Sequence, residues 1–337
     1  MIKKLALLIL FLALAAAGGT YWAYGQIESY VASPINPENE TLIVVPDGAN
    51  YHSFTRKLVA EGVVDTSPWA RWAAKTHPEL TKLKAGTYQV EPGTSLADLF
   101  ALVRSGKEHQ FSITFVEGST FKEWREALAN SNYLVHDTQA LSEKDIAQKL
   151  GLKEEKLEGL LLPETYHYVA GESDLSVLKR ANVQLNRALN EAWGEREQGL
   201  PIKSEYDLLT LASIIEKETA VDAEREKVAS VFVNRLNKGM RLQTDPTVIY
   251  GMGDNYDGNI RKNDLRTPTP YNTYVIFGLP PTPIAMPGKA SILAAANPAD
   301  TPYFYFVADG LGGHKFSKTL TEHNRAVRQY LKTLRNK

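Results

Sequence analysis

The N-terminal segment places the strongest constraint on how this chain can fold, because it is long, apolar and uncharged. Two lysines precede 23 residues without a charge, Leu5 to Ile27. About 20 apolar residues are enough to cross the hydrocarbon core of a bilayer as a helix. Trp22 and Tyr24 lie near the far end, where aromatic side chains favour the membrane interface. We therefore expect residues 1–27 to form a transmembrane helix.

A cleaved signal peptide is the alternative, because the small residues between Leu12 and Gly18 offer cleavage positions. The apolar stretch continues past them, whereas a signal core is usually shorter, so we favour a retained single-pass anchor. With lysines before the span and Glu28 after it, the positive-inside rule leaves the N-terminus in the cytoplasm. The rest of the chain is then expected on the periplasmic or extracytoplasmic side of the cytoplasmic membrane.

Composition excludes several classes of function. A chain of 337 residues that is 43% hydrophobic is large enough for two domains with real cores. Its 38 basic and 39 acidic residues give a net charge of −1, so no broad positive field favours nucleic acid as a partner. It contains no cysteine, which excludes disulfides, thiolate metal ligands and a cysteine nucleophile. The seven histidines lack metal-ligand spacing, and we expect neither a metal nor another cofactor.

Residues 28–40, which contain two prolines, are expected to form an extended linker. The next stretch predicts a strand over 41–45, a helix over 51–59, a helix capped by Ser67, a strand over 84–90 and a helix between Ser95 and Gly106. This order resembles a LysM module, a small fold that recognises glycans containing N-acetylglucosamine, and we assign it to 41–107. Trp69 and Trp72 either pack its core or stack on sugar rings.

From residue 108 to 337, helices and short strands alternate without repeats, as in one α+β domain. The expected fold class is therefore α+β, with a transmembrane helix, a LysM-like module and a larger catalytic domain. Long amphipathic helices are expected over 174–193 and 223–237, and an aromatic strand over 303–307. Thr319 and Glu322 form a capping box that should open the last helix.

One helix of this domain should be buried, because residues 208–215 are nearly all apolar. It ends in Glu216 and Glu218. Glu218 has aliphatic side chains three, four and seven positions before it, so burial should raise its pKa and make it the better general acid. Glu216 points about 200° away around the helix and is expected to be solvated. From this stretch alone, two ordinary glutamates at the end of a helix remain the alternative.

Polar and proline-rich segments follow this helix. Residues 241–247 are expected to form a loop, because aspartate before proline favours an extended or turn conformation. Such segments suit a hydroxyl-rich ligand, since sugar rings offer apolar faces to aromatic rings and hydroxyl edges to amides and carboxylates. The candidate substrate-binding residues are Gln243, Thr244, Asp245, Tyr250, Asn272 and Tyr274, together with His314 in a glycine-rich loop. The alternative is that the tyrosines only cover a core and that His314 is an ordinary surface histidine.

Seven segments, in this order along the chain, are similar to the endolytic murein transglycosylase family, the YceG-like or MltG proteins. They are SIIEKETA at 213–220, VASVFVNR at 228–235, MRLQTDPTVIY at 240–250, YNTY at 271–274, GLPP at 278–281, ANP at 296–298 and YFYFVAD at 303–309. The resemblance covers the whole chain. It implies an enzyme that cleaves nascent peptidoglycan glycan strands outside the cytoplasmic membrane with Glu218 as its catalytic residue, and it suggests peptidoglycan synthases as partners.

The implied reaction is a lytic transglycosylation, which cleaves the bond between N-acetylmuramic acid and N-acetylglucosamine without water. One glutamate suffices, because the nucleophile is the C6 hydroxyl of the same muramic residue and proximity replaces a second carboxylate. Two alternatives remain open. The chain could be a hydrolytic muramidase that uses Glu218 and Asp245 as a carboxyl pair, or a non-catalytic glycan-binding scaffold of the cell envelope.

Overall fold

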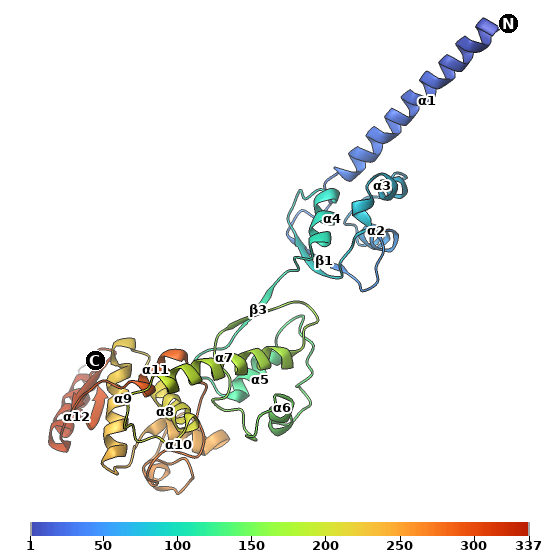
Figure 1. Cartoon of the computed structure of the whole chain (residues 1–337). Coiled ribbons are helices and arrows are strands. Elements are labelled where there is room, and N and C mark those ends of the chain that lie inside the picture. The colour runs from blue at the N-terminus through green and yellow to red at the C-terminus, as the bar shows by residue number, and fades with distance from the viewer. Residues whose placement is uncertain (1, 336–337) are drawn as a thin grey trace. The chain divides into compact units, whose positions relative to one another are not determined.

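The computed structural model describes residues 2–335. It contains two compact units, Met1–Phe111 with His167–Gly171, and Ser112–Tyr166 with Glu172–Lys337 (Figure 1). Helices predominate in both, and the strands pair into three two-stranded sheets within the described residues. The predicted α+β class is confirmed.

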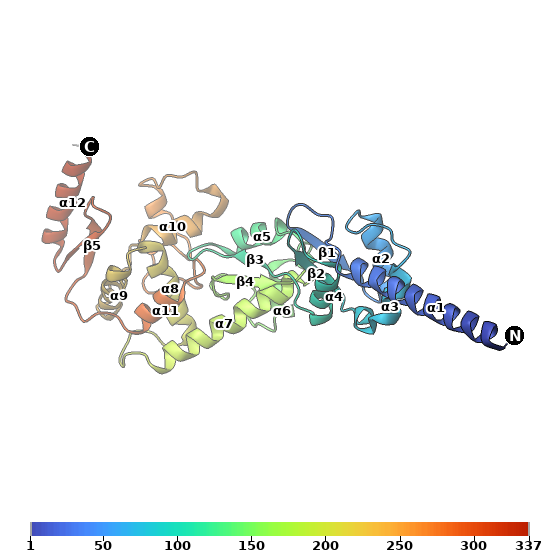
Figure 2. The ribbon, with the colours of Figure 1, turned by 90° about the horizontal axis from the view of Figure 1, so that it is seen from above.

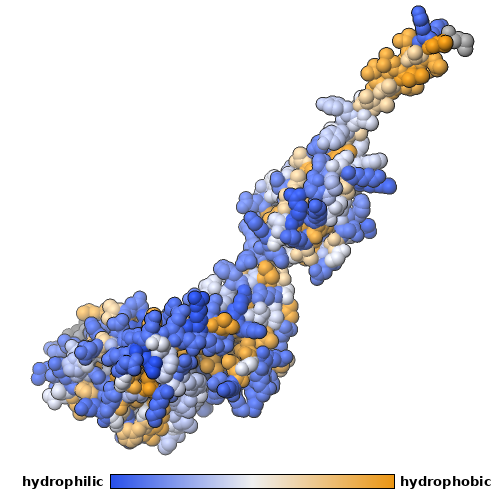
Figure 3. Space-filling view, viewed as in Figure 1, coloured by the Kyte–Doolittle hydropathy of each residue, from blue (hydrophilic) through white to orange (hydrophobic). Residues whose placement is uncertain are grey.

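The first unit begins with α1 (Ile2–Val31), which is the apolar helix expected at the N-terminus. Within residues 2–335 it is the one helix long and apolar enough to cross a membrane. Its surface is almost entirely hydrophobic over most of its length (Figure 3). Only Ile27 and Val31 are buried, both in its last turns. These features are consistent with a single-pass anchor that continues into the folded part of the unit.

The module after α1 has the predicted order of elements. It contains β1 (Thr41–Val45), α2 (Tyr51–Ala60), α3 (Ala70–Thr76), the 3₁₀ helix η1 (Pro78–Thr81), β2 (Gly86–Val90) and α4 (Leu96–Ser105). The two strands are antiparallel, with Thr41 opposite Val90 and Val45 opposite Gly86. Ser95 caps α4 by accepting a hydrogen bond from Asp98 N, and Gly106 ends the helix at φ 74°.

The first part of the predicted linker is built into this module. The side chain of Ile35 is buried. Its backbone N–H donates to Thr94 O at 2.8 Å, and Leu96 N donates to Ser33 O at 2.9 Å. Burial of an apolar side chain and pairing of the backbone both fix the segment, so these residues do not act as a free spacer.

The second unit is built around α8 (Glu205–Glu218), whose residues 208–215 are all buried, as the sequence predicts. The helices α7 (Asp174–Gly194), α9 (Asp222–Asn237) and α11 (Lys289–Ala296) pack against it (Figure 2). The other elements that follow the module along the chain are β3 (Phe111–Thr114), α5 (Phe121–Ala129), α6 (Glu143–Lys149), β4 (Thr165–Tyr168), α10 (Asp245–Met252), η2 (Gly253–Asn255), η3 (Asp264–Arg266), β5 (Tyr305–Ala308), β6 (His314–Ser317) and α12 (Leu320–Arg335). The strands β5 and β6 are antiparallel.

The prediction of a loop over residues 241–247 is wrong from Asp245 onwards, where α10 begins. Pro246 lies in the first helical turn. Proline is tolerated there, because the N–H groups of the first turn have no partner within the helix and the fixed φ of proline suits the helix. The Asp-Pro pair therefore opens a helix here instead of preventing one.

Gly159 lies where the chain packs closely against Pro283, and this contact can be tested by substitution. Its φ is +79°, and a Cβ at this position would lie 2.3 Å from Pro283 Cβ. Gly199 has a similar φ of +84° but open space around it. We expect Gly199→Ala to lower the free energy of unfolding by about 1 kcal/mol through left-handed strain. Gly159→Ala should lower the free energy of unfolding by about 1–3 kcal/mol more than Gly199→Ala does, because the added methyl group overpacks the site. Urea unfolding of the detergent-solubilised chain measures both, and equal losses would contradict this packing.

Candidate active site

The C-terminal end of α8 opens into a pocket of about 340 Å³. The pocket is lined by Glu218, Phe232, Arg235, Leu242, Gln243, Thr244, Asp245, Tyr274, Tyr305, Phe306, Leu320 and His323. These residues come from α8, α9, the segment 242–244 and the start of α10, the segment around residue 274, β5 and α12. Four of the predicted binding residues therefore lie in the same pocket as Glu218, namely Gln243, Thr244, Asp245 and Tyr274.

Glu218 is partly accessible from this pocket, at the end of a buried helix. The hydroxyl of Thr244 donates a hydrogen bond to Glu218 Oε1. Burial raises the pKa of the Glu218 carboxyl, and the negative charge of Asp245 raises it further. The Thr244 hydrogen bond and the charges of His314 and Arg235 act in the opposite direction. The net effect is a raised pKa, which favours the protonated acid at higher pH than for an exposed glutamate.

Glu216 lies on the other side of the same turn. Its Oε2 accepts a hydrogen bond from the backbone N–H of Gly288 at 2.9 Å. The next residue, Lys217, donates from Nζ to Gly118 O at 2.8 Å. The two glutamates have different partners, as their expected separation implies, but Glu216 is half-buried and hydrogen-bonded instead of fully solvated. Its carboxyl binds the backbone just before α11 and helps to fix the end of α8.

Three threonines fix the segment that faces Glu218. Thr244 N donates to the hydroxyl of Thr273 at 3.0 Å, and the hydroxyl of Thr247 donates to Thr244 O at 2.7 Å. The hydroxyls of Thr247 and Thr273 lie 2.8 Å apart. All three side chains are buried. Buried hydroxyls that pair with one another and with the backbone hold Thr244 in place against the carboxyl.

Arg235 connects the two chain segments that form the rest of the pocket wall. It is buried, and its Nε donates to Phe304 O at 2.7 Å. Its Nη1 donates to Leu242 O at 2.8 Å and to Arg241 O at 3.1 Å. The guanidinium also lies 5.0 Å from the centroid of the Tyr305 ring. Burial lowers the pKa of Arg235.

Asp245 and Gln243 lie at the exposed mouth of the pocket. The hydroxyl of Tyr274 donates to Asp245 Oδ1 at 2.6 Å. Gln243 adopts a positive φ of 50°, which is uncommon for a residue other than glycine. The Gln243 side chain therefore extends from a strained backbone conformation between Leu242 and Thr244, which are both held by hydrogen bonds. Strained positions of this kind are common at ligand-binding sites.

Three predicted binding residues lie outside this pocket lining. Tyr250 packs against Tyr271, with ring centroids 4.8 Å apart. Asn272 is buried, and its Nδ2 donates to the carbonyl oxygens of two residues in the preceding loop, at 3.0 and 2.8 Å. His314 Nδ1 lies 2.8 Å from Glu224 Oε2, and this pair joins β6 to α9. Of these three residues, only His314 influences the pKa of Glu218, which its charge lowers.

His323 and Tyr305 line the pocket but were not among the predicted residues. Their rings stack with centroids 5.2 Å apart. Burial and the positive charge of Arg235 both lower the pKa of His323, so the neutral imidazole is favoured. Its Nδ1 is buried and makes no hydrogen bond within residues 2–335. No local motif marks His323, whereas Arg235 could have been found, because it follows Phe232 and Val231 by three and four positions on their buried face.

The pocket therefore presents the Glu218 carboxyl, whose pKa is raised, together with the Asp245 carboxyl, the Arg235 guanidinium, hydroxyl, amide, phenol and imidazole groups, and aromatic rings. Such a lining suits a hydroxyl-rich ligand in which one bond needs a proton. The described part of the chain contains no cluster of three or more acidic, histidine or cysteine side chains that could hold a metal ion.

Comparisons with known proteins agree with the sequence resemblance. A family model described as the YceG-like family matches residues 43–329. An endolytic murein transglycosylase from Bacillus subtilis (strain 168) is 32% identical over 346 residues, covering 95% of this chain and 92% of that protein. A protein of the same name from Streptococcus pneumoniae serotype 2 is 26% identical, covering 97% of this chain and 65% of that protein.

A solved structure is also similar. The crystal structure of a yceG-like protein from Listeria monocytogenes matches with a TM-score of 0.56 and 29% sequence identity, over 86% of this chain and 99% of that one. The family model covers more than half of the chain, and the Bacillus subtilis relative exceeds 30% identity over nearly its whole length. The chain therefore belongs to the YceG-like family.

Proposed function

We propose that this chain is an endolytic murein transglycosylase that cleaves the bond between N-acetylmuramic acid and N-acetylglucosamine in nascent glycan strands. The observation that carries the proposal is the raised pKa of Glu218 in a pocket lined by hydrogen-bonding side chains and aromatic rings. Relatives that match nearly the whole chain bear the name of this activity. A lyase of this kind needs one acid that is protonated at the start of the reaction and can accept a proton later.

Glu218 serves both steps. The protonated carboxyl donates its proton to the glycosidic oxygen, and the bond from that oxygen to C1 of the muramic residue breaks. The resulting carboxylate then takes the proton from the C6 hydroxyl of the same residue, whose oxygen bonds to C1 and closes a 1,6-anhydro ring. No water is consumed, and Glu218 ends protonated again. Among the described residues, Thr244 bonds Oε1 and no partner bonds Oε2, which leaves that oxygen for the substrate.

The remaining pocket residues bind and orient the sugars. Gln243, Thr244, Asp245 and Tyr274 supply hydrogen-bonding groups on one wall. Asp245 also carries a negative charge that helps to keep Glu218 protonated. Tyr305 and His323 line the same pocket, and the imidazole of His323 is favoured in its neutral form. We retain Tyr250, Asn272 and His314 as outer or supporting positions, because their contacts fix elements that border the pocket.

The other parts of the chain place this chemistry at the membrane. In the proposed arrangement, residues 1–27 anchor the chain with its N-terminus in the cytoplasm, and 28–40 connect to the module. Residues 41–107 form a LysM-like glycan-recognition module, and 108–337 form the catalytic domain on the outer side. The exposed apolar surface of α1 and the order of elements in the module support this layout. Peptidoglycan synthases are the proposed neighbours, because they make the nascent strands.

Hydrolysis is the second candidate, because Asp245 lines the same pocket as Glu218 and its charge influences the Glu218 pKa. In that reaction Asp245 would act as the second carboxyl, either as a base that activates water or as a nucleophile that attacks the sugar. Its hydrogen bond to Tyr274 instead suits a binding role.

Product mass separates the two reactions. Digestion of defined glycan strands by the detergent-solubilised chain should give 1,6-anhydro-N-acetylmuramic acid ends, which lack the water that a hydrolase adds. Mass spectrometry of the released fragments measures this directly. Reducing ends with one added water in most products would establish hydrolysis, and intact strands would remove the enzymatic proposal.

Replacement of Glu218 by glutamine tests the catalytic residue. The amide keeps the shape but cannot deliver a proton, so we expect turnover to fall by about 10²–10⁴-fold while glycan binding persists. Glu216→Gln is the matched control, because its amide oxygen can still accept the hydrogen bond from Gly288 N. Its turnover should stay near that of the unmodified chain. A rate of Glu218→Gln equal to the control would refute the assignment.

The environment of Glu218 predicts opposite pH shifts for two variants. Cleavage needs the protonated acid, so kcat/KM should fall as pH rises through the Glu218 pKa. Asp245→Asn removes a charge that raises this pKa and should move the fall to lower pH. Thr244→Val removes a hydrogen bond that lowers it and should move the fall to higher pH. The pH profiles of kcat/KM test this, and shifts in the same direction would contradict it.

A further inference from the structure

The helix α1 passes from its apolar span into the module without a break, so it sets the distance between the module and the bilayer. Lys4 and Trp22 are eighteen residues apart, a rise of about 27 Å, which is close to the roughly 30 Å thickness of a hydrocarbon core. Tyr21, Trp22 and Tyr24 are all exposed on α1. Exposed aromatic side chains at the end of an apolar span mark the membrane interface.

The module reaches this interface through Trp69. The ring of Trp22 meets the ring of Trp69 edge to face, with centroids 5.7 Å apart. Trp69 directly precedes α3. The N-terminal end of α3 therefore lies at nearly the same depth as the aromatic residues of α1.

The outer face of α3 has the composition of a helix that lies in a membrane interface. Arg71, Trp72 and Lys75 are exposed, whereas Ala73 is buried in the module. The indole of Trp72 is 50% exposed, and Lys75 Nζ lies 4.7 Å from its centroid. An exposed tryptophan flanked by basic side chains suits phospholipid headgroups, which offer phosphates beside an apolar boundary.

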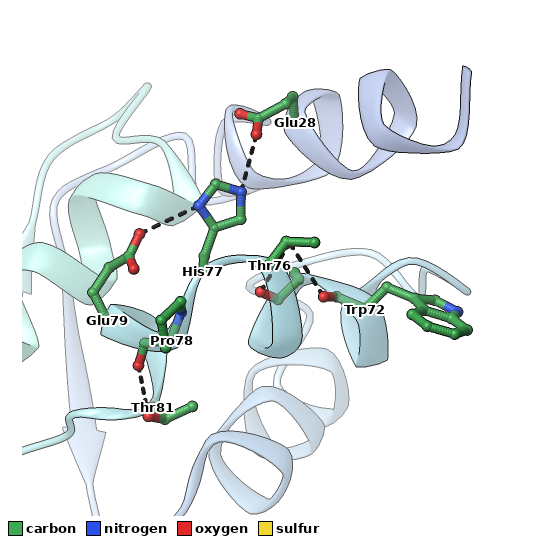
Figure 4. A network of polar contacts seen from close by, with 8 residues as sticks. Glu28, Trp72, Thr76, His77, Pro78, Glu79 and Thr81 are labelled. Carbon is green, nitrogen blue, oxygen red and sulfur yellow. Dashed lines mark hydrogen bonds and ion pairs between the residues drawn. The ribbon is translucent and has the colours of Figure 1, made fainter. Parts of the chain in front are cut away.

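Polar contacts fix α3 to α1. His77, just after α3, lies with Nε2 3.1 Å from Glu28 Oε1 on α1 and with Nδ1 3.3 Å from Glu79 Oε1 (Figure 4). Figure 4 shows the indole of Trp72 projecting away from His77. The buried side chains of Ile27 and Val31 add apolar contacts between α1 and the module. These contacts hold α3 beside the last turns of α1, close to the end of the apolar span.

We propose that the face of α3 formed by Arg71, Trp72 and Lys75 docks on the phospholipid headgroups of the bilayer that α1 crosses. This inference rests on the membrane anchoring in the proposed function. Trp72 lies among the headgroups, and the two basic side chains pair with lipid phosphates. The module is then held on the membrane surface, and Trp72 is engaged by lipid instead of by a sugar ring.

The absence of cysteine from the chain allows a test with single labels. In the full chain, Thr76→Cys carries an environment-sensitive fluorophore one turn from Trp72 and leaves the docking residues intact. Val44→Cys is the control on the same unit, since Val44 is 46% exposed on β1, which lies farther from the N-terminus of α1 than α3 does (Figures 1 and 2). Leu12→Cys reports on the anchor alone. Each labelled chain is reconstituted in vesicles of phosphatidylethanolamine and phosphatidylglycerol that contain lipids spin-labelled near the headgroup or along the acyl chain.

We expect headgroup spin labels to quench the fluorophore at position 76 strongly and the one at position 44 weakly, and acyl-chain labels to quench position 12. In the chain labelled at position 76, quenching by headgroup spin labels reports the ratio of docked to undocked module. Each of Arg71→Ser and Lys75→Ser should lower this ratio by about fivefold. Trp72→Ser should lower it as well.

Three results would overturn the proposal. Quenching at position 12 without quenching at position 76 would leave the anchor intact and remove the docking. Absence of quenching at position 12 would remove both. A response at position 76 to soluble N-acetylglucosamine oligomers, without a response to spin-labelled lipid, would assign the same face to glycan and would also overturn it.

Discussion

The second unit depends on keeping one carboxyl away from water. Burial disfavours the charged form, so the pKa of Glu218 rises and the protonated acid persists. The buried stretch of α8 places Glu218 at the boundary between core and pocket. Glu216 and Lys217 bind the backbone at Gly288 and Gly118, on the other side of the helix end. These bonds fix the last turn of α8, from which the Glu218 side chain reaches the pocket and meets Thr244.

A buried cation beside this acid would be expected to keep it ionised, and Arg235 lines the same pocket. Its guanidinium instead donates to the carbonyl oxygens of Phe304, Arg241 and Leu242. These neutral acceptors hold two pocket walls together, and the opposing effect of Arg235 on the Glu218 pKa is smaller than that of burial. Asp245, at the pocket mouth, adds a contribution in the same direction as burial. One arginine thus shapes the pocket and still leaves the acid with a raised pKa.

The sequence predicted features that depend on neighbours along the chain, such as the buried helix before Glu218 and the caps at Ser95 and Thr319. The cap expected at Ser67 is wrong, because α3 begins at Ala70 with Trp69 at its N-cap. The sequence could not decide which side of a short helix faces the pocket. Because α10 begins at Asp245, Tyr250 is five residues later and points about 140° away around the helix. Its ring therefore packs against Tyr271 while Asp245 reaches the pocket. His323 was missed for a different reason, since only tertiary packing brings α12 to a pocket whose other residues begin as far back as Glu218.

Position and chemistry contribute separately to the selectivity of the proposed enzyme. The glycosidic bond that Glu218 is proposed to cleave occurs throughout mature and nascent peptidoglycan alike, so pocket chemistry alone gives no preference for new strands. In the proposed arrangement, α1 supplies one, because it continues from the bilayer into a folded module and keeps the first unit near the membrane. The residues expected to be a spacer are partly bound into that module, which reduces its freedom to move away. A preference for nascent strands then comes from anchoring at the membrane, as proposed, and the acid at the end of α8 is needed only for the chemistry of the bond.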